Sequence, residues 1–467
     1  MQGTMKRVIG VAALAFGVSC GSPQGSGTRS QAEPAPHPKP PVAQTQPTAT
    51  APVLADTPAG RTFKAWLEAF NSGDEARIRA FAEQHKSPNI VNMQFRKHTG
   101  GIDLVSVEKS DRLELRVVVK DRATPTTGVG WFKITDTDPP EIVTLRFLAI
   151  PPGATAADMD RKIDGDTRSR VLDAIVAKLT ELYVYPDVAK KMEQALRDNQ
   201  KHGAYDAVSD SHAFADLLTE QLQGVSHDRH LSVSFMPIPL PKGDPDANPE
   251  DTARFREELK KANCFFEKAE RLDGNIGYIK FDGFGDVDIC GPKATAAFAT
   301  LGDVDAVIFD LRQNGGGDSE MVAFVSSYLF AKKTHLNDIY ERKANKTTQS
   351  WTNPDVPGQK LATQPVFVLT SHDTFSAAED FTYGLKNLKR ATIVGETTGG
   401  GAHPTMGVRL DDHFMIRVPT ARSISPITKT DWEGTGVEPD VKVPADQALE
   451  TAKRLATEAL EHQKQKK

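Results

Sequence analysis

A serine stands where a predicted strand runs into a predicted helix. Residues 366–370 are a short apolar run typical of a strand, and residues 377–388 have the spacing of an amphipathic helix. Ser376 therefore presents its hydroxyl at the helix start, where the next backbone N–H groups have no partner within the helix and could bind an oxyanion. Serine also caps helices, and taken alone capping is the better interpretation.

Three consecutive glycines follow another predicted strand. Residues 306–311 are apolar, and Gly315, Gly316 and Gly317 come shortly after them, before a helix predicted over residues 321–330. Glycines let the backbone approach a bound group closely and turn N–H groups outward, as acyl-transfer chemistry requires. An ordinary flexible turn is the alternative. A phosphate-binding loop is disfavoured because no Gly-Lys-Ser/Thr pattern follows.

Four ordered segments resemble one protein family. They are Asp310-Leu311-Arg312 with Asn314-Gly315-Gly316-Gly317, Thr374-Phe375-Ser376-Ala377-Ala378-Glu379, Gly395-Glu396-Thr397-Thr398-Gly399-Gly400, and Trp432-Glu433-Gly434 with Gly436-Val437 and Pro439-Asp440. The set is similar to the C-terminal-processing (tail-specific) serine peptidases, and the similarity covers about residues 166–448. The resemblance implies a ClpP/crotonase-like α/β core with Ser376 as the nucleophile.

Two departures from that pattern indicate a branch of the family. Members with a Ser/Lys dyad carry the lysine at the position of Gly401, and no insertion the size of a PDZ domain precedes the core. Both features resemble the branch that contains the tricorn protease core and the repeats of interphotoreceptor retinoid-binding protein. In tricorn-type members a histidine and a glutamate serve the serine, and the matching residues here are His230 and Glu433.

The resemblance thus implies a triad and an oxyanion hole. A neutral His230 would take the proton of Ser376, and Glu433 would fix the tautomer of the imidazole and stabilise the imidazolium. The oxyanion donors implied by the same matching are the backbone N–H groups of Gly317, its alternative Gly316, and Ala377.

Rival assignments stay open for both partners of the serine. Three other histidines near the motifs are alternative bases: His227, His372 and His403. Glu379 or Glu396 could approach the site, and Glu433 could instead form a structural ion pair. Asp310 and Arg312 are expected to hold the glycine turn in place.

Composition and periodicity divide the chain into six segments. They are a signal peptide (1–20), a disordered Pro/Ala/Thr-rich tether (21–58), an α+β accessory domain (59–152), a helical subdomain (160–240), the α/β catalytic domain (264–448) and a C-terminal helix or tail (449–467). The accessory domain loosely resembles the nuclear-transport-factor-like group and shows no site of its own. A hairpin is predicted around Asp411-Asp412-His413.

Charge and cysteine usage narrow the function. A formal net charge of -5 and the lack of a basic block argue against a nucleic-acid partner. No Cys/His cluster predicts a metal site, and no cofactor is implied. Cys264 and Cys290 could pair in an exported protein, but two buried free thiols are slightly favoured.

The N-terminal residues resemble an export signal. Lys6 and Arg7 precede an apolar run over residues 8–18, which is too short to cross a bilayer. Cys20 follows as the candidate for lipidation, although Gly17 stands where such sites usually carry leucine. Plain secretion and a retained cytosolic N-terminus are the alternatives.

The sequence as a whole predicts a serine peptidase of the bacterial cell envelope, anchored to a membrane by lipid and acting on a peptide or protein substrate. A non-catalytic module that binds apolar ligands or peptides on the same fold is one alternative, and an esterase with the same triad is another. The oligomeric state is not indicated by any feature of the sequence.

Overall fold

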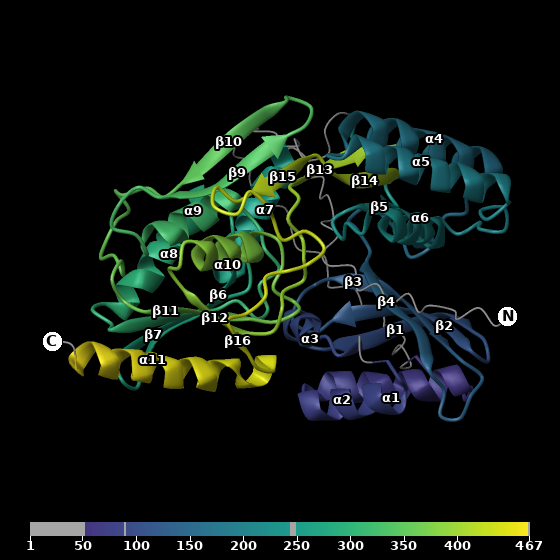
Figure 1. Cartoon of the computed structure of the whole chain (residues 1–467). Helices are drawn as coiled ribbons and strands as arrows, with labels where there is room; N and C mark the ends of the chain where they lie inside the picture. Colours follow the sequence, from purple (N-terminus) through teal and green to yellow (C-terminus); the bar gives the residue numbers. More distant parts are fainter. Residues whose placement is uncertain (1–51, 88–89, 243–248, 466–467) are drawn as a thin grey trace, which may run out of the picture. The chain divides into compact units, whose positions relative to one another are not determined.

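The computed structural model describes residues 52–87, 90–242 and 249–465 (Figure 1). The predicted signal peptide, Cys20 and most of the predicted tether lie outside these residues. The chain divides into two compact units after Arg161, and each unit is described by itself. Among the described helices, none is both long and apolar enough to span a bilayer.

The first unit packs three helices against an antiparallel sheet of strand order β1-β2-β3-β4. Its helices are α1 (Pro58–Ser72), α2 (Glu75–Gln84) and α3 (Met93–Thr99), and its strands are β1 (Ile102–Ser110), β2 (Glu114–Asp121), β3 (Thr127–Ile134) and β4 (Ile142–Ala149). Phe63, Trp66 and Phe70 are buried along one side of α1, as their helical spacing predicts. An α+β accessory unit therefore precedes the catalytic part of the chain.

The second unit begins with three helices and a short strand. These are α4 (Gly165–Leu182), α5 (Pro186–Lys201), α6 (Ser211–Ser226) and β5 (Ser232–Phe235). Their core is completed from far along the chain by the predicted hairpin, β13 (Thr405–Arg409) and β14 (Phe414–Pro419), which joins β5 in the order β13-β14-β5 (Figure 1). The loop between α6 and β5 is thereby held against the segment around Gly399, whose carbonyl accepts a hydrogen bond from the Arg229 guanidinium at 2.9 Å.

A six-stranded sheet forms the centre of the second unit, in the order β16-β12-β11-β8-β7-β6. The strands are β6 (Phe266–Leu272), β7 (Ile276–Phe281), β8 (Ala306–Asp310), β11 (Val366–Thr370), β12 (Thr392–Gly395) and β16 (Val441–Lys442). All neighbouring pairs are parallel except β6 with β7. The predicted α/β core is confirmed.

Helices cover both faces of this sheet (Figure 1). On one face lie α8 (Val287–Leu301), α9 (Ser319–Ser327) and α10 (Ala377–Asn387), and on the other lies α11 (Ala448–Gln465). Because both faces are buried, the central strands β8 and β11 are apolar throughout instead of alternating.

Two features of this unit were not predicted from the sequence. One is α7 (Pro249–Lys261), and the other is a small sheet of order β10-β9-β15, made by β9 (His335–Glu341), β10 (Lys346–Trp351) and β15 (Ala421–Ile424). Nearly every residue of β10 is exposed. A strand without a buried face has no apolar period, so its sequence gives no signal.

Cys264 and Cys290 form a disulfide, so the slight preference for two free thiols is wrong. Both residues are buried, and their Cα atoms are 5.5 Å apart, within the range that a disulfide bridges. The first precedes β6 and the second lies in α8. Only the packing of α8 beside β6 brings them together, and cysteine spacing does not encode that packing.

Candidate active site

Ser376 occupies a strained turn between β11 and α10. Its φ is 54° and its ψ is -119°, values that residues other than glycine rarely adopt. Such a conformation costs on the order of 1–3 kcal/mol and persists only where the surrounding structure holds it. Helix capping alone does not explain this conformation of Ser376, because a capping residue does not require a positive φ.

The residue that holds this turn is Glu379. Its Oε2 accepts hydrogen bonds from the N–H groups of Ser376 and Gly401, both at 2.8 Å. Its Oε1 accepts from the N–H of Gly400 at 2.7 Å and from the hydroxyl of Thr398 at 2.5 Å. With four donors, this fully buried carboxylate fixes the serine turn to the loop that follows β12, and it has no oxygen left for a histidine.

The glycine turn after β8 contacts the serine directly. A Cβ on Gly316 would lie 2.7 Å from Ser376 Cβ and 2.9 Å from the nitrogen of Ala377, so only glycine permits this approach. The N–H of Gly316 donates to Asn314 Oδ1 at 2.9 Å. The N–H groups of Gly317 and Ala377, by contrast, have no acceptor within the described parts of the chain. The geometry favours Gly317 over its alternative Gly316 as an oxyanion donor.

Asp310 and Arg312 hold the glycine turn, as predicted. The Arg312 guanidinium makes two hydrogen bonds to the Asp310 carboxylate, at 2.8 and 2.6 Å, and a third to the carbonyl of Ala445 at 2.7 Å. Burial alone would raise the pKa of Asp310, but Arg312 and the hydroxyl of Tyr278 hold it below its usual value. The pair is structural. Glu396 is structural as well, since its Oε1 accepts from the N–H of Ala445 at 2.9 Å.

His230 lies in the loop between α6 and β5, beside the serine turn. Its ring centroid is 4.7 Å from that of Phe375, the residue before Ser376. A Cβ on Gly401 would lie 2.5 Å from His230 Cε1 and 2.2 Å from Phe375 Cζ. The space that a dyad lysine would need at Gly401 is therefore filled by the imidazole and the phenyl ring.

The imidazole of His230 is neutral and free to accept a proton. Its side chain is 12% exposed, and neither ring nitrogen has a hydrogen-bond partner among the residues described. Burial lowers the pKa of His230 to about 4, although the nearby charge of Asp228 acts in the opposite direction. A neutral imidazole with an available nitrogen is what a general base requires.

A second histidine and two carboxylates lie next to His230. A nitrogen of His230 and carboxylate oxygens of Asp228 and Glu433 all lie within 4.8 Å of one another. His403 Nδ1 lies 2.6 Å from Asp228 Oδ2 and 3.4 Å from Glu433 Oε2. Burial raises the pKa of Glu433 to about 7, with the charge of Asp228 adding to the effect and that of His403 opposing it.

The two carboxylates differ in how fully their oxygens are used. Asp228 accepts from the backbone N–H of His230 at 3.1 Å through Oδ1, and from the Tyr183 hydroxyl at 3.3 Å and His403 through Oδ2. Glu433 Oε2 accepts from the N–H of Ala402 at 2.6 Å, whereas its Oε1 is buried without a partner in the described structure. Asp228 Oδ1 lies 3.8 Å from His230 Nδ1 but already accepts a backbone N–H, so the nearby Glu433 carboxylate, with Oε1 unpartnered in the described structure, is the acceptor still available.

The rival bases are placed less favourably. His227 is an exposed residue at the C-terminal end of α6, and His372 is exposed on the loop before Ser376. His403 is 1% exposed and its Nδ1 faces Asp228. The motifs pointed to His403 only as a rival base, and Asp228 was not predicted as a site residue. The spacing Asp228-x-His230 was the signal available for the latter.

The donor types of Asp228, His230 and Glu433 also suit a divalent cation. However, the imidazole of His403 already faces both carboxylates. A protonated His403 would supply there the positive charge that a cation would otherwise bring. The residues fit an acid–base cluster better than a metal site.

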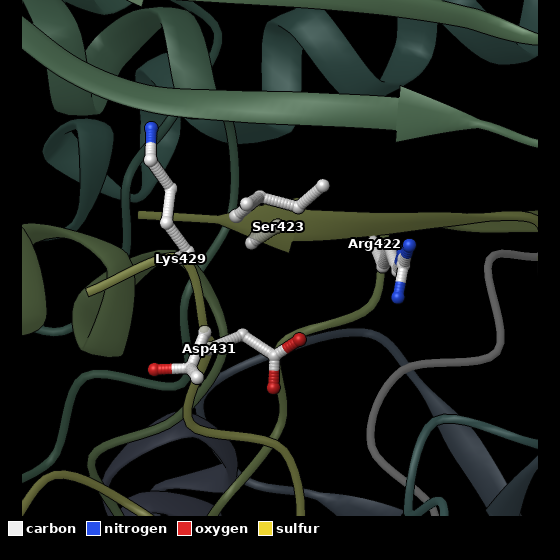
Figure 2. A pocket seen from close by; sticks show the side chains of 6 residues that line it. Arg422, Ser423, Lys429 and Asp431 are labelled. Atoms are coloured by element: carbon white, nitrogen blue, oxygen red, sulfur yellow. The ribbon is translucent and has the colours of Figure 1, made fainter. Parts of the chain in front are cut away.

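A pocket of about 270 Å³ lies one layer of side chains away from this cluster. Figure 2 shows Arg422 and Ser423 on β15, and Lys429 and Asp431 on the loop that follows it. The Arg422 guanidinium stacks over the Tyr185 ring at 5.6 Å, and that ring lies 5.4 Å from the His403 ring. The pocket thus provides polar and charged side chains near the candidate acid–base cluster.

Two family models match the second unit. Residues 275–443 match peptidase family S41, and residues 166–267 match the N-terminal domain of Peptidase_S41 in eukaryotic IRBP. The carboxyl-terminal-processing peptidase 2 of Arabidopsis thaliana chloroplasts is 27% identical over 194 residues, which are 40% of this chain and 35% of the relative. The tricorn protease of Thermoplasma volcanium is 25% identical over 41% of this chain and 17% of the relative. The chain thus spans well under half the length of these relatives.

Solved structures give remote matches. A lipoprotein from Streptococcus agalactiae has a TM-score of 0.42 and 15% identity, covering 62% of this chain and 96% of that one. The photosystem II D1 C-terminal processing protease has a TM-score of 0.40 and 17% identity, covering 63% of this chain and 98% of that one.

Proposed function

Because residues 275–443 match peptidase family S41 and residues 166–267 match the N-terminal domain of Peptidase_S41 in eukaryotic IRBP, we propose that the chain is a serine peptidase that hydrolyses peptide bonds through Ser376, His230 and Glu433. The observation that carries the proposal is the strained serine turn. This turn adjoins the N–H groups of Gly317 and Ala377, which have no acceptor in the described structure, and Phe375 at its start packs against the neutral imidazole of His230.

Acylation uses both groups at once. Ser376 Oγ forms a bond to the carbonyl carbon of the substrate while His230 takes the hydroxyl proton. The negative charge that develops on the carbonyl oxygen is stabilised by the N–H groups of Gly317 and Ala377. When the C–N bond breaks, His230 returns the proton to the leaving amine, and an acyl-enzyme remains.

Deacylation repeats the cycle with water as the nucleophile. His230 takes a proton from the water, and the tetrahedral intermediate is again held by Gly317 and Ala377. In both steps the imidazole becomes positively charged in a site where burial disfavours charge. The carboxylate of Glu433 offsets this cost, because its free Oε1 can accept a hydrogen bond from the imidazolium.

Hydrolysis of a fluorogenic peptide mixture by the purified protein tests the proposal. Ser376→Ala should lower kcat/KM by roughly 10⁴–10⁶-fold, as expected for loss of a nucleophile. The matched control is Ser350→Ala on β10, which should retain wild-type activity. Equal activity of the Ser376→Ala variant would refute the nucleophile assignment, and a wild-type protein without hydrolase activity would refute the enzyme.

A binding module on the same fold is the second candidate, because residues 166–267 match the N-terminal domain found in IRBP. A module that only binds apolar ligands gains nothing from a strained serine, and buried unpartnered polar atoms would weaken it. An esterase with the same triad would hydrolyse aryl esters but leave peptides intact. The peptide assay therefore separates both alternatives from a peptidase.

We further propose that the protein is exported and anchored through Cys20. The positively charged N-terminus, the short apolar run and the disulfide between Cys264 and Cys290 all support this location, since structural disulfides persist mainly in oxidising compartments. In cells fed a labelled fatty acid, the wild-type protein should take up label and fractionate with membranes. A Cys20→Ala variant that keeps both properties would contradict the anchor.

A further inference from the structure

The cluster of Asp228, His403 and Glu433 contains more ionisable groups than a serine triad needs. His403 Nδ1 lies between the two carboxylates, 2.6 Å from Asp228 Oδ2 and 3.4 Å from Glu433 Oε2. Asp228 and His403 are each 1% exposed and come from segments far apart in the sequence. Charges on such side chains are costly to bury unless they are paired and hydrogen-bonded, as Asp228 and His403 are with each other.

Glu433 is the group whose charge state depends most on this pair. Burial and the charge of Asp228 both favour its protonated form, and the charge of His403 opposes them. A protonated Glu433 could not stabilise an imidazolium at His230. Burial would lower the pKa of His403, but the hydrogen bond to Asp228, together with the charges of Glu433 and Asp228, outweighs it and raises that pKa, which favours the imidazolium.

We propose that His403, held by Asp228, is a positioning residue whose imidazolium keeps the Glu433 carboxylate ionised and leaves its Oε1 free to meet His230. The inference rests on the proposed function, since it concerns the acid partner of the same triad. His403 does not touch the reacting atoms. It acts through Glu433, whose Oε2 is already engaged by the N–H of Ala402 and by His403.

The charged and titratable groups that face this cluster come from several elements. Besides His230 and the three residues of the cluster they are Tyr183 and Tyr185 after α4, Arg229 beside His230, Arg417 on β14 and Asp431 on the segment of Glu433. Asp431 faces His403 and Glu433 and carries a negative charge that favours protonation of both. His403 supplies the positive charge that opposes protonation of Glu433.

The test is the pH profile of kcat/KM in His403→Asn. Asparagine places an N–H donor where His403 has Nδ1 but carries no charge. Loss of a charge within about 4–6 Å moves a carboxyl pKa by roughly 1–3 units. The acidic limb should therefore shift upward by at least about one pH unit, giving about a tenfold loss near pH 6 and little loss near pH 9. The loss should appear in kcat, with KM unchanged.

His335→Gln is the matched control. His335 Nε2 pairs with Asp338 Oδ1 at 2.7 Å on β9, so the change removes a similar His–Asp pair away from the cluster. Its pH profile should equal that of the wild type. An unshifted profile in His403→Asn, with Ser376→Ala inactive, would overturn the inference and leave the proposed function intact. Loss in His403→Asn at every pH, as deep as in His230→Gln, would instead make His403 the base.

Asp228→Asn tests whether Asp228 positions His403 or is itself the carboxylate that stabilises the His230 imidazolium. If Asp228 were the acid partner of the triad, this variant would lose activity as fully as the triad variants while Glu433→Gln stayed active, which would overturn the inference.

A measurement on the unmodified protein covers the case in which His403→Asn does not fold. Nitrogen NMR of histidine-labelled protein at pH 7 should find His403 protonated on both ring nitrogens and His230 neutral. A neutral His403 at that pH would contradict the inference.

Discussion

The two halves of the candidate active site are built in opposite ways. On the nucleophile side the surroundings of Ser376 are saturated with hydrogen bonds, because Glu379 alone accepts four and Arg312 makes three. On the base side several polar atoms are buried without a partner among the described residues: both ring nitrogens of His230, Nε2 of His403 and Oε1 of Glu433. The surroundings of Ser376 form a rigid scaffold, whereas the groups around His230 are those that bind and release protons.

This difference has a physical reason. A nucleophile must be held in one strained conformation, which requires a surrounding structure that over-determines it. A base must change charge during the reaction, so its polar atoms and those of its carboxylate partner cannot all be satisfied in one protonation state. Buried groups without partners are costly, and their concentration beside Ser376 is evidence that they serve the reaction.

The largest effect on the base side is expected from His230→Gln. Without an imidazole no group near Ser376 can take its proton, so kcat/KM should fall by about 10⁴–10⁶-fold, as in Ser376→Ala. The thermal midpoint should change little, because neither ring nitrogen makes a hydrogen bond in the described structure. A variant that retains more than about a tenth of the activity would transfer the base role to another histidine.

A somewhat smaller effect is expected from Glu433→Gln. Loss of the acid partner of a triad lowers kcat by about 10⁴-fold. Because burial holds the pKa of Glu433 at about 7 in the wild type, kcat/KM should rise with pH through that region as the carboxylate ionises. This acidic limb should be absent from the residual activity of the variant. If the limb persists, another group is responsible for it.

Gly401→Ala should disrupt the contact between the serine turn and the imidazole of His230. The added Cβ would meet Phe375 Cζ at 2.2 Å and His230 Cε1 at 2.5 Å, so the imidazole must move away from Ser376. A displacement of the imidazole by about 1 Å lowers the rate on the order of 10²-fold. Gly224→Ala on α6 serves as the control, because Gly224, like Gly401, lacks a positive φ and has no atom within 4 Å of its Cβ position. Equal rates in Gly401→Ala and wild type would show that His230 need not stay where it is.

The smallest effect on chemistry is expected from the disulfide. Replacing Cys264 and Cys290 by alanine removes a link between positions 26 residues apart, which should lower the free energy of unfolding by about 2–4 kcal/mol. Because neither cysteine touches Ser376 or His230, kcat/KM at a temperature where the variant is folded should remain within about twofold of the wild type. Denaturant unfolding and a rate assay on the same sample would measure both.

The sequence was informative where the chemistry is local. Ser376, the glycine turn and the central parallel strands lie in continuous segments whose motifs and apolar runs can be read directly. The hairpin of β13 and β14 was predicted too. Its departure from the α/β core, to complete the hydrophobic core of α4, α5 and α6, was not predicted. That departure brings His230 to the serine, and it depends on packing between residues some 170 positions apart, as the bond from Arg229 Nη1 to the carbonyl of Gly399 illustrates.

Asp228, His403 and the disulfide were missed or misjudged for the same reason. His403 and Asp228 lie 175 positions apart in the sequence, and Cys264 meets Cys290 only because α8 lies beside β6. No spacing in a single sequence records such contacts. The sequence also could not decide whether Gly316 or Gly317 is the oxyanion donor, because that depends on which N–H already donates to Asn314.

Labelling by a fluorophosphonate probe tests the central claim most directly, because it reports on the nucleophile and its base without knowledge of the substrate. The wild-type protein should be labelled at Ser376 alone, at a rate that rises with pH through the titration of the base-side cluster. The Ser376→Ala variant should stay unlabelled, and His230→Gln should label at least about a hundredfold more slowly. Labelling that persists in Ser376→Ala, or a His230→Gln variant that labels at the wild-type rate, would contradict the account.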